Sequence, residues 1–448
     1  MPITAGVGVS LTPDNRGMSS RIPSRKTVRT LSLALNRFYK PSSIFVPSIE
    51  DLRKPDALAR RFQLPGRMLM MSEGAREILG SMAKSIHLLS EHRAETTYSD
   101  TYQACLRLIE DMYEKRLRPT DGQELIELVE GKLAEQVDEH TFAVPLYGVD
   151  LIGMDSLDLG RMKIVRADPG WLRSQGVRWD EEVVRGLDPD PYKYWLVGSA
   201  TGSTDVTLQL FRADAELAVG MLAISAASIH RNGATRIRIG VVMSPETAHG
   251  GADWLSWKKR EKELIRHYQF RASQDFRIDG ALVQQFADSG VFLRAFEVLQ
   301  APTRSELGEV LARAVHWYSD AHREVVPVMK LVKFWSCIES FFSADKKEIT
   351  QSVSVGLTCV LIFGGFDFIQ ESSYQDTKRR VADLYDQRSK AVHAASHDHV
   401  GEKDIATLSQ WVAWMLINMV SFIDRGYTRL SEVKKAGEEI DARMTASA

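Results

Sequence analysis

The sequence is poor in cysteine and nearly neutral in charge. Its 448 residues include only three cysteines, Cys105, Cys337 and Cys359, which lie far apart and form no CxxC pair. This scarcity argues against a disulfide scaffold or a zinc ribbon and suits a reducing compartment. The 57 Lys and Arg residues almost balance the 59 Asp and Glu residues, so the net charge is -2. Such a balance excludes a broad electrostatic field for nucleic acid or membranes, and any nucleic-acid role therefore requires a local site.

The sequence also lacks a long apolar run and the common signatures of enzymes. The most apolar stretch, 352–368, is interrupted by glycines and Asp367 and falls short of the ~20 apolar residues that a membrane span needs. Because the first residues do not form a signal-peptide core, we expect a cytoplasmic protein without a membrane partner. No P-loop, HExxH or G-x-S-x-G motif occurs, which leaves NTPase, zinc-protease and serine-hydrolase functions unsupported.

A metal site has little support in the sequence. The segment His397-Asp-His399 carries residue types that bind metals. Alternating positions on one loop do not close a site by themselves, however, and no other ligand cluster is evident. We therefore expect no metal and no cofactor.

From the length of the chain we expect about three domains, at about 150 residues each. We expect an α+β fold with these segments: a basic flexible arm (1–40), an N-terminal helical region (41–138), a mixed α/β domain (139–302), an all-α bundle (303–430) and a polar tail (431–448). The arm contains several Arg and Lys residues but only one acidic residue, Asp14. This pattern indicates either a contact with an anionic partner or a solvated, loose terminus.

The mixed domain is predicted from short segments rich in β-branched and aromatic residues with turns between them. Strands are predicted at 141–147, 162–165, 193–197, 206–211 and 235–242, and a helix at 213–230. The segment Trp254-Leu-Ser-Trp257-Lys-Lys-Arg260 combines aromatic and basic residues. It suits either stacking on nucleobases or a solvated helix face.

The last part of the chain is predicted to be helical. Apolar stripes at helical spacing predict helices at 304–323, 327–343, 348–364, 374–394 and 402–425. Thr303 and Glu306 have the spacing of a capping box at the start of the first helix. Short connections between such helices favour an antiparallel bundle.

Two charged residues fall on apolar faces of this bundle. Arg388 lies on the stripe that includes Val381 and Val392, and Glu339 falls within the stripe of the helix at 327–343. Because an unpaired buried charge is costly, we predict that Glu339 and Arg388 form an ion pair. The pair could belong to a functional cleft or be a plain interhelical ion pair. The arginine could also extend out of the stripe to solvent.

His393 follows Arg388 in the segment LYDQRSKAVHA. At about 100° per residue, the two side chains point about 140° apart on a straight helix. Either the helix ends near His393, or the site is shared between two copies of the chain. Arginine beside histidine suits phosphodiester chemistry, because Arg stabilises charge on a phosphate and His moves protons near neutral pH.

The R-x4-H motif, the upstream IESFF segment and the order of helices resemble the HEPN superfamily (higher eukaryotes and prokaryotes nucleotide-binding). The resemblance is to its ApeA-like branch and covers about residues 304–430. It implies a metal-independent endoribonuclease that leaves a 2′,3′-cyclic phosphate. Arg388 and His393 would be catalytic, Glu339 would orient Arg388, and Ser389 and Lys390 would help to hold the phosphate.

The same resemblance implies a biological setting and leaves alternatives open. It implies an RNA substrate, a homodimer formed through the bundle, and a role in anti-phage defence or toxin-like growth arrest with an inhibitor or trigger protein. One alternative is a non-catalytic HEPN module that binds a nucleotide or a partner. Another is a structural helical protein in which the Arg–Glu pair only fixes the helix register.

Overall fold

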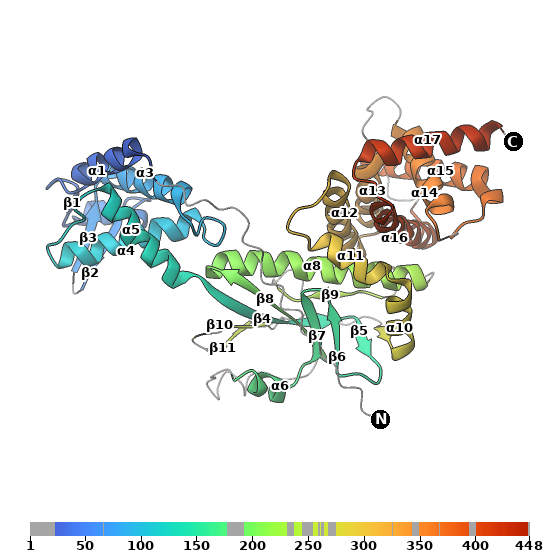
Figure 1. Cartoon of the computed structure of the whole chain (residues 1–448), viewed down its shortest axis with the longest axis horizontal. Helices are drawn as coiled ribbons and strands as arrows, with labels where there is room; N and C mark the ends of the chain where they lie inside the picture. The colour runs from blue at the N-terminus through green and yellow to red at the C-terminus, as the bar shows by residue number, and fades with distance from the viewer. Residues whose placement is uncertain are drawn as a thin grey trace. The chain divides into compact units, whose positions relative to one another are not determined.

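The computed structural model is of the α+β class, with helices towards both ends of the chain and most strands between them (Figure 1). It describes residues 23–65, 67–176, 192–230, 237–243, 254–258, 260, 264–267, 275–324, 326–342, 349–366, 368–393 and 400–446. The chain divides into two compact units. Unit 1 is Met1–Glu139 with Thr201–Leu208, and unit 2 is His140–Ala200 with Gln209–Ala448.

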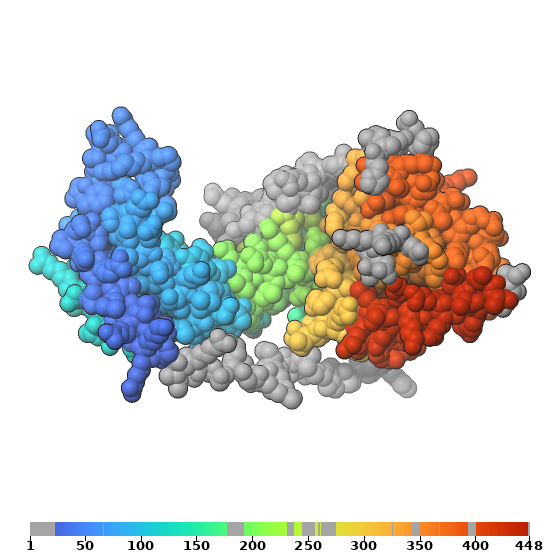
Figure 2. Space-filling model, turned by 90° about the horizontal axis from the view of Figure 1, so that it is seen from above, coloured from blue at the N-terminus to red at the C-terminus, as the bar shows by residue number. Residues whose placement is uncertain are grey.

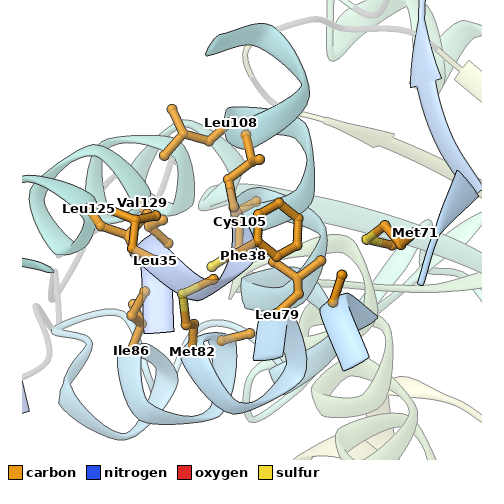
Figure 3. Packing of buried hydrophobic residues seen from close by; sticks show 14 of the residues in the cluster. Leu35, Phe38, Met71, Leu79, Met82, Ile86, Cys105, Leu108, Leu125 and Val129 are labelled. Atoms are coloured by element: carbon orange, nitrogen blue, oxygen red, sulfur yellow. The ribbon is translucent and has the colours of Figure 1, made fainter. Parts of the chain in front are cut away.

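Unit 1 packs helices around a small sheet. Its helices are α1 (Arg25–Phe38), α2 (Ile49–Leu52), α3 (Glu73–Leu89), α4 (Tyr98–Glu114) and α5 (Gly122–Gln136), with a 3-10 turn η1 (Leu58–Arg60). Its strands are β1 (Ile44–Phe45), β2 (Arg61–Leu64) and β3 (Arg67–Met71), in the antiparallel order β1-β3-β2. Leu35 and Phe38 of α1 point into a core that contains Leu79, Met82 and Cys105 (Figure 3).

Unit 1 differs from the prediction in two respects. The described second half of the predicted flexible arm is the ordered helix α1, while residues 1–22 lie outside the described part. The reason is an apolar stripe of Leu31, Leu35 and Phe38, which buries α1 against the core despite its many cations. The predicted helical region also contains three short strands that the helical periodicity around them concealed.

Unit 2 begins with a sheet that carries helices on its faces. Its strands are β4 (Asp138–Tyr147), β6 (Ser156–Leu159), β7 (Met162–Arg166), β8 (Tyr194–Gly202), β9 (Gly240–Val241), β10 (Trp254–Lys258) and β11 (Leu264–His267). The order is β11-β10-β4-β8-β7-β6, with β9 also paired to β4. A separate parallel pair joins β5 (Val149–Leu151) to β12 (Phe276–Ile278).

Successive residues of β4 show how the two faces of the sheet are covered. Phe142 stacks on Phe211 of the long helix α8 (Thr204–Ile229), with ring centroids 4.8 Å apart. Its neighbour Ala143 points to the opposite face, where it joins a cluster with Trp195 and Trp257 near the short helix α6 (Pro169–Ser174). This alternation is the ordinary consequence of the two-residue repeat of a strand.

Several predictions for the mixed domain are confirmed and two are wrong. Strands are found at 141–147, 162–165 and 194–197, as predicted, and the described part of 235–242 includes β9. The predicted strand at 206–211 is instead the first part of α8, because Phe211 is buried against the sheet from a helix. The segment that begins at Trp254 is strand β10, not a helix, and Trp257 is buried in the sheet cluster with no face left for stacking on nucleobases.

The five predicted helices of the bundle are confirmed to within two residues at each end. They are α12 (Glu306–Arg323), α13 (Pro327–Phe342), α14 (Ile349–Phe363), α15 (Tyr374–His393) and α16 (Glu402–Asp424). They are preceded by α10 (Gly280–Ser289) and α11 (Val291–Leu299). The predicted cap at Thr303 is wrong, because Ser305 is the N-cap of α12 and accepts a hydrogen bond from the Gly308 N–H.

The predicted polar tail also forms part of the bundle. Its residues make helix α17 (Leu430–Ala446), which lies along the outside of unit 2 (dark red in Figure 2). Val433 and Gly437 of α17 are buried, and Ile440 and Met444 pack against a core cluster that contains Cys359 of α14. Most charges of the segment are exposed, whereas Asp441 accepts hydrogen bonds from Tyr374 and Lys378 of α15.

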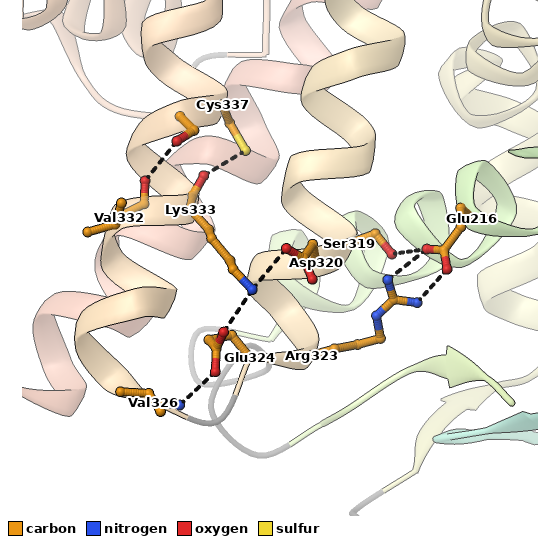
Figure 4. Close-up of polar contacts among 10 residues, drawn as sticks. Glu216, Ser319, Asp320, Arg323, Glu324, Val326, Val332, Lys333 and Cys337 are labelled. Atoms are coloured by element: carbon orange, nitrogen blue, oxygen red, sulfur yellow. Dashed lines mark hydrogen bonds and ion pairs between the residues drawn. The ribbon is translucent and has the colours of Figure 1, made fainter. Parts of the chain in front are cut away.

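Bundle and sheet meet through α12 and α8 and belong to one compact unit. Arg323 of α12 donates to Glu216 of α8 at 2.9 Å, and Ser319 donates to the same carboxylate (Figure 4). Asp320, the residue after Ser319, lies 2.9 Å from the Nζ atom of Lys333 of α13. A chain of polar contacts therefore runs from the sheet-covering helix into the bundle.

Within the described part of the chain, α16 is long and apolar enough to cross a membrane. Most of its apolar length is buried against neighbouring helices, which is consistent with the core helix of a soluble protein.

Candidate functional site

The predicted ion pair between Arg388 and Glu339 is present and joins α15 to α13. The Nη2 atom of Arg388 lies 3.0 Å from Oε1 and 3.1 Å from Oε2 of Glu339. About a fifth of each side chain is exposed, 21% for Arg388 and 20% for Glu339. The pair is thus formed at the edge of the bundle core, where solvent still reaches it.

Aromatic side chains support this pair from inside the bundle. The Arg388 guanidinium carbon lies 5.7 Å from the centre of the Tyr385 ring, within the range of a cation–π contact. Tyr385 in turn meets the buried Trp335 edge to face, with centroids 5.0 Å apart. Burial raises the pKa of the Tyr385 hydroxyl, and the nearby charge of Glu339 and a hydrogen bond to it add to this shift. The guanidinium is therefore held between a carboxylate and an aromatic ring.

The ion pair does not use every donor of Arg388. Both contacts to Glu339 come from Nη2, whereas Nε is buried and has no hydrogen-bond partner among the described residues. A buried donor without a partner costs free energy.

The two predicted supporting residues lie differently around α15. Ser389 is half-buried beside Arg388 on the helix. Lys390 is exposed, and its Nζ atom lies 2.6 Å from Asp386 one turn earlier on the same helix. In this structure Lys390 belongs to the solvent face of α15 and is not brought to Arg388.

His393 is the last residue of α15, which agrees with the prediction that the helix ends near it. Its side chain lies outside the described residues, and so does the segment with His397 and His399. The backbone of α15 is helical from Arg388 to His393.

A second contact to α15 was not predicted. Asp404, in the first turn of α16, accepts from Arg380 and lies 3.5 Å from Nε2 of Gln387. These contacts fix the start of α16 against the middle of α15. In the sequence, Asp404 is only an acid in the first turn of a predicted helix, a position that the helix dipole favours. That position does not show which residues the acid contacts.

Among the residues that the structure describes, no group of three or more His, Cys, Asp or Glu side chains is placed to hold a metal ion. Comparison with known proteins found no match to any family model, curated protein or solved structure. The site is therefore defined by its geometry alone: a partly exposed arginine, fixed by a carboxylate and an aromatic ring, five residues before the histidine that ends its helix.

Proposed function

We propose that the C-terminal bundle is a metal-independent endoribonuclease of HEPN type, in which Arg388 and His393 from two copies line one cleft. The observation that carries the proposal is the Arg388–Glu339 pair, with its guanidinium held in place yet one-fifth exposed. Preorganised charge of this kind is what a transition state with growing negative charge requires. The five-residue spacing of Arg388 and His393 in the sequence, about 140° around a straight helix, favours a site completed by a second copy.

The proposed reaction uses the RNA itself as the nucleophile. The 2′-oxygen attacks the adjacent phosphorus, its proton passes to a base, and the bond from phosphorus to the 5′-oxygen breaks. The products are a 2′,3′-cyclic phosphate and a 5′-hydroxyl, which takes up a proton as it leaves. His393 serves the proton transfers, and Arg388 stabilises the charge on the phosphorane oxygens. Because DNA lacks the 2′-hydroxyl, the substrate is RNA.

The biological setting is proposed from the resemblance alone. It is a cytoplasmic nuclease of anti-phage defence or growth arrest, controlled by an inhibitor or trigger protein. Expression of the chain would then stop growth in a manner that depends on His393.

The test compares RNA cleavage by the purified chain and its variants in EDTA. His393→Ala and Arg388→Ala should each lower the cleavage rate by at least about 100-fold, the usual range for a lost proton-transfer group or a lost charge stabiliser. The matched controls are His92→Ala in unit 1 and Arg379→Ala on the exposed side of α15, which should leave the rate unchanged. Loss of wild-type activity in EDTA, or full activity of His393→Ala, would contradict the mechanism.

One observation favours the non-catalytic alternative. Lys390 pairs with Asp386 on the solvent face, so the motif offers fewer cations to a phosphate than the catalytic hypothesis expects. A monomer that binds RNA or a nucleotide without cleaving it would support this alternative. Arg388→Ala distinguishes the purely structural hypothesis from the other two, because that hypothesis expects the substitution to unfold the chain. A partly exposed pair contributes about 1 kcal/mol, so we expect the chain to stay folded without it.

A further inference from the structure

A group of cations covers the outer face of α1 in unit 1. Its members are Arg25, Lys26, Arg29, Arg37 and Lys40, and all of these side chains are exposed. They will be called the α1 basic face. The proposed nuclease site lies in unit 2 and does not involve them.

The amphipathic character of α1 explains why these cations share a face. Its apolar residues Leu31, Leu35 and Phe38 are buried in the core of unit 1, where Figure 3 labels Leu35 and Phe38. At about 100° per residue, the four cations within the helix span an arc of about 120° opposite this stripe. Lys40 follows just beyond the helix end. The core of unit 1 therefore holds the α1 basic face towards solvent.

The charge of this face is not compensated locally. The sequence has no acidic residue between Asp14 and Glu50. In the described part of unit 1, ion pairs involve other side chains, such as Lys54 with Asp51 and Lys132 with Glu135. The cations of α1 consequently point to solvent as a group of one sign.

The arrangement works against the stability of α1 itself. Arg25 and Lys26 stand in the first turn, which contains no acidic residue, although the helix dipole favours acids there. Arg25 and Arg29 are four residues apart, a spacing at which like charges repel. A helix adapted only for stability would carry the opposite charges in its first turn. An anionic partner would remove both conflicts.

We propose that the α1 basic face docks the phosphate backbone of an RNA strand. The choice of RNA rests on the function proposed for the bundle, whose substrate this surface would hold. The helix has 14 residues, and at about 1.5 Å per residue it is about 21 Å long, enough to follow several phosphates. A repeating polyanion matches such a group of cations better than a single small anion, and backbone contacts of this kind bind without selecting a sequence.

The burial of α1 favours RNA over a membrane. An amphipathic helix that binds lipid inserts its apolar face into the interface. The apolar stripe of α1 is already used in the core, and Leu33, 58% exposed, is the apolar residue on its solvent side. The surface thus offers charge without the apolar area that insertion needs.

The experiment measures binding of a fluorescent single-stranded RNA to the full chain carrying His393→Ala, so that cleavage does not interfere. The test variant adds Arg25→Glu, Lys26→Glu and Arg29→Glu. The matched control adds Lys84→Glu, Arg93→Glu and Lys115→Glu, three exposed cations of unit 1 that lie outside α1. We expect a plot of the logarithm of the RNA-binding constant against the logarithm of the salt concentration to be linear. Five phosphate contacts give a slope of about -3.5, and the loss of three contacts in the test variant should reduce the slope to about -1.4.

The test variant should bind RNA at least ten-fold more weakly at low salt than the control, since about three ion contacts are lost. Its melting temperature should stay the same or rise, because acids replace cations in the first turn of α1. A DNA strand of the same sequence should bind similarly, since only the backbone is contacted. Equal RNA binding by the test and control variants would overturn the proposal. Binding of phosphatidylserine vesicles through α1 in place of RNA would overturn it as well.

The outcome is separable from that of the proposed nuclease. If RNA binds through α1 but no variant or wild-type chain cleaves it, the nuclease proposal fails and the docking surface stands. If the wild-type chain cleaves RNA while the charge reversals on α1 change neither binding nor the KM for cleavage, the docking surface fails and the nuclease stands.

Discussion

Arg388 and His322 are two titratable residues of the bundle, and the structure accommodates them in different ways. Arg388 lies against Glu339, and solvent reaches both side chains. His322 of α12 is completely buried, and its Nε2 atom accepts a hydrogen bond from the Ile239 N–H at 3.2 Å. Burial, together with the smaller effects of the positive charges of Lys330, Arg323 and Arg238, lowers the pKa of His322 to about 3. His322 is therefore a neutral core residue.

His322 makes the fold sensitive to acid. In the unfolded chain the pKa of His322 returns to about 6.5. Below this pH the unfolded state therefore binds a proton that the folded state does not bind. The free energy of unfolding should fall as the pH drops below about 6.5, by up to about 1.4 kcal/mol per pH unit. His322→Gln keeps an acceptor for Ile239 and should flatten this dependence between about pH 6 and about pH 4, measured by urea unfolding. His92→Gln, on a partly exposed histidine, serves as control. An unchanged slope in His322→Gln would contradict the assignment.

At the scale of elements, the contact between α8 and α12 joins the sheet to the bundle. Gly220 of α8 faces α12 so closely that an added Cβ would lie 2.6 Å from the Cγ1 atom of Val315 and 3.1 Å from its backbone oxygen. A glycine is needed here because the two helix backbones approach each other. Nothing in the sequence marked Gly220 as different from other helical glycines.

Two identical substitutions test this contact. Gly220→Ala should destabilise the protein by about 1–3 kcal/mol, because the added methyl group overpacks the contact with Val315. Gly131→Ala in α5, where an added Cβ meets nothing within 4 Å, should instead stabilise by up to about 1 kcal/mol through helix propensity. Scanning calorimetry measures both changes. Equal effects of the two substitutions would show that α8 and α12 have room to separate.

At the scale of the whole molecule, the small net charge of -2 hides a segregation of charge. Cations of α1 form an exposed face in unit 1, while the bundle of unit 2 carries a single held arginine at the proposed site. The near-zero net charge of the chain excludes a general electrostatic attraction of the whole molecule for nucleic acid. It permits one local docking surface and one cleft. The proposed dimer would bring two such arginines together.

The proposed dimer gives a prediction at this scale. Val392 is 46% exposed on α15, next to His393, so a pairing of two bundles at the motif would bury it. Val392→Glu should weaken the dimer at least ten-fold, as expected when a charge is desolvated at an interface, and should lower RNA cleavage with it. The control is Val326→Glu, on a valine 47% exposed just before α13. Analytical ultracentrifugation measures the dimer, and a wild-type chain that stays monomeric would contradict the shared cleft.

The bundle was predictable because its information is local. The apolar stripes of α12 to α16 repeat at helical spacing, so their bounds could be predicted to within two residues. Arg388 and Glu339 stood out as charges on those stripes, and the cost of an unpaired charge predicted their contact. The strand content of unit 1 and the helical start of α8 were not predicted, because their short segments carry no clear period and tertiary contacts decide their state.

The sequence by itself determined the helices of the bundle and the Arg388–Glu339 pair, because the periodicity of apolar residues is a property of the chain. Its composition also fixed the low cysteine content and the small net charge. Only the tertiary structure decided where the remaining groups point. It turned Lys390 towards Asp386, buried Trp257 in the sheet and packed α1 so that its cations face solvent. These outcomes depend on neighbours distant in the sequence, and the free energy of burying an apolar stripe outweighs the weaker local preferences that a linear pattern records.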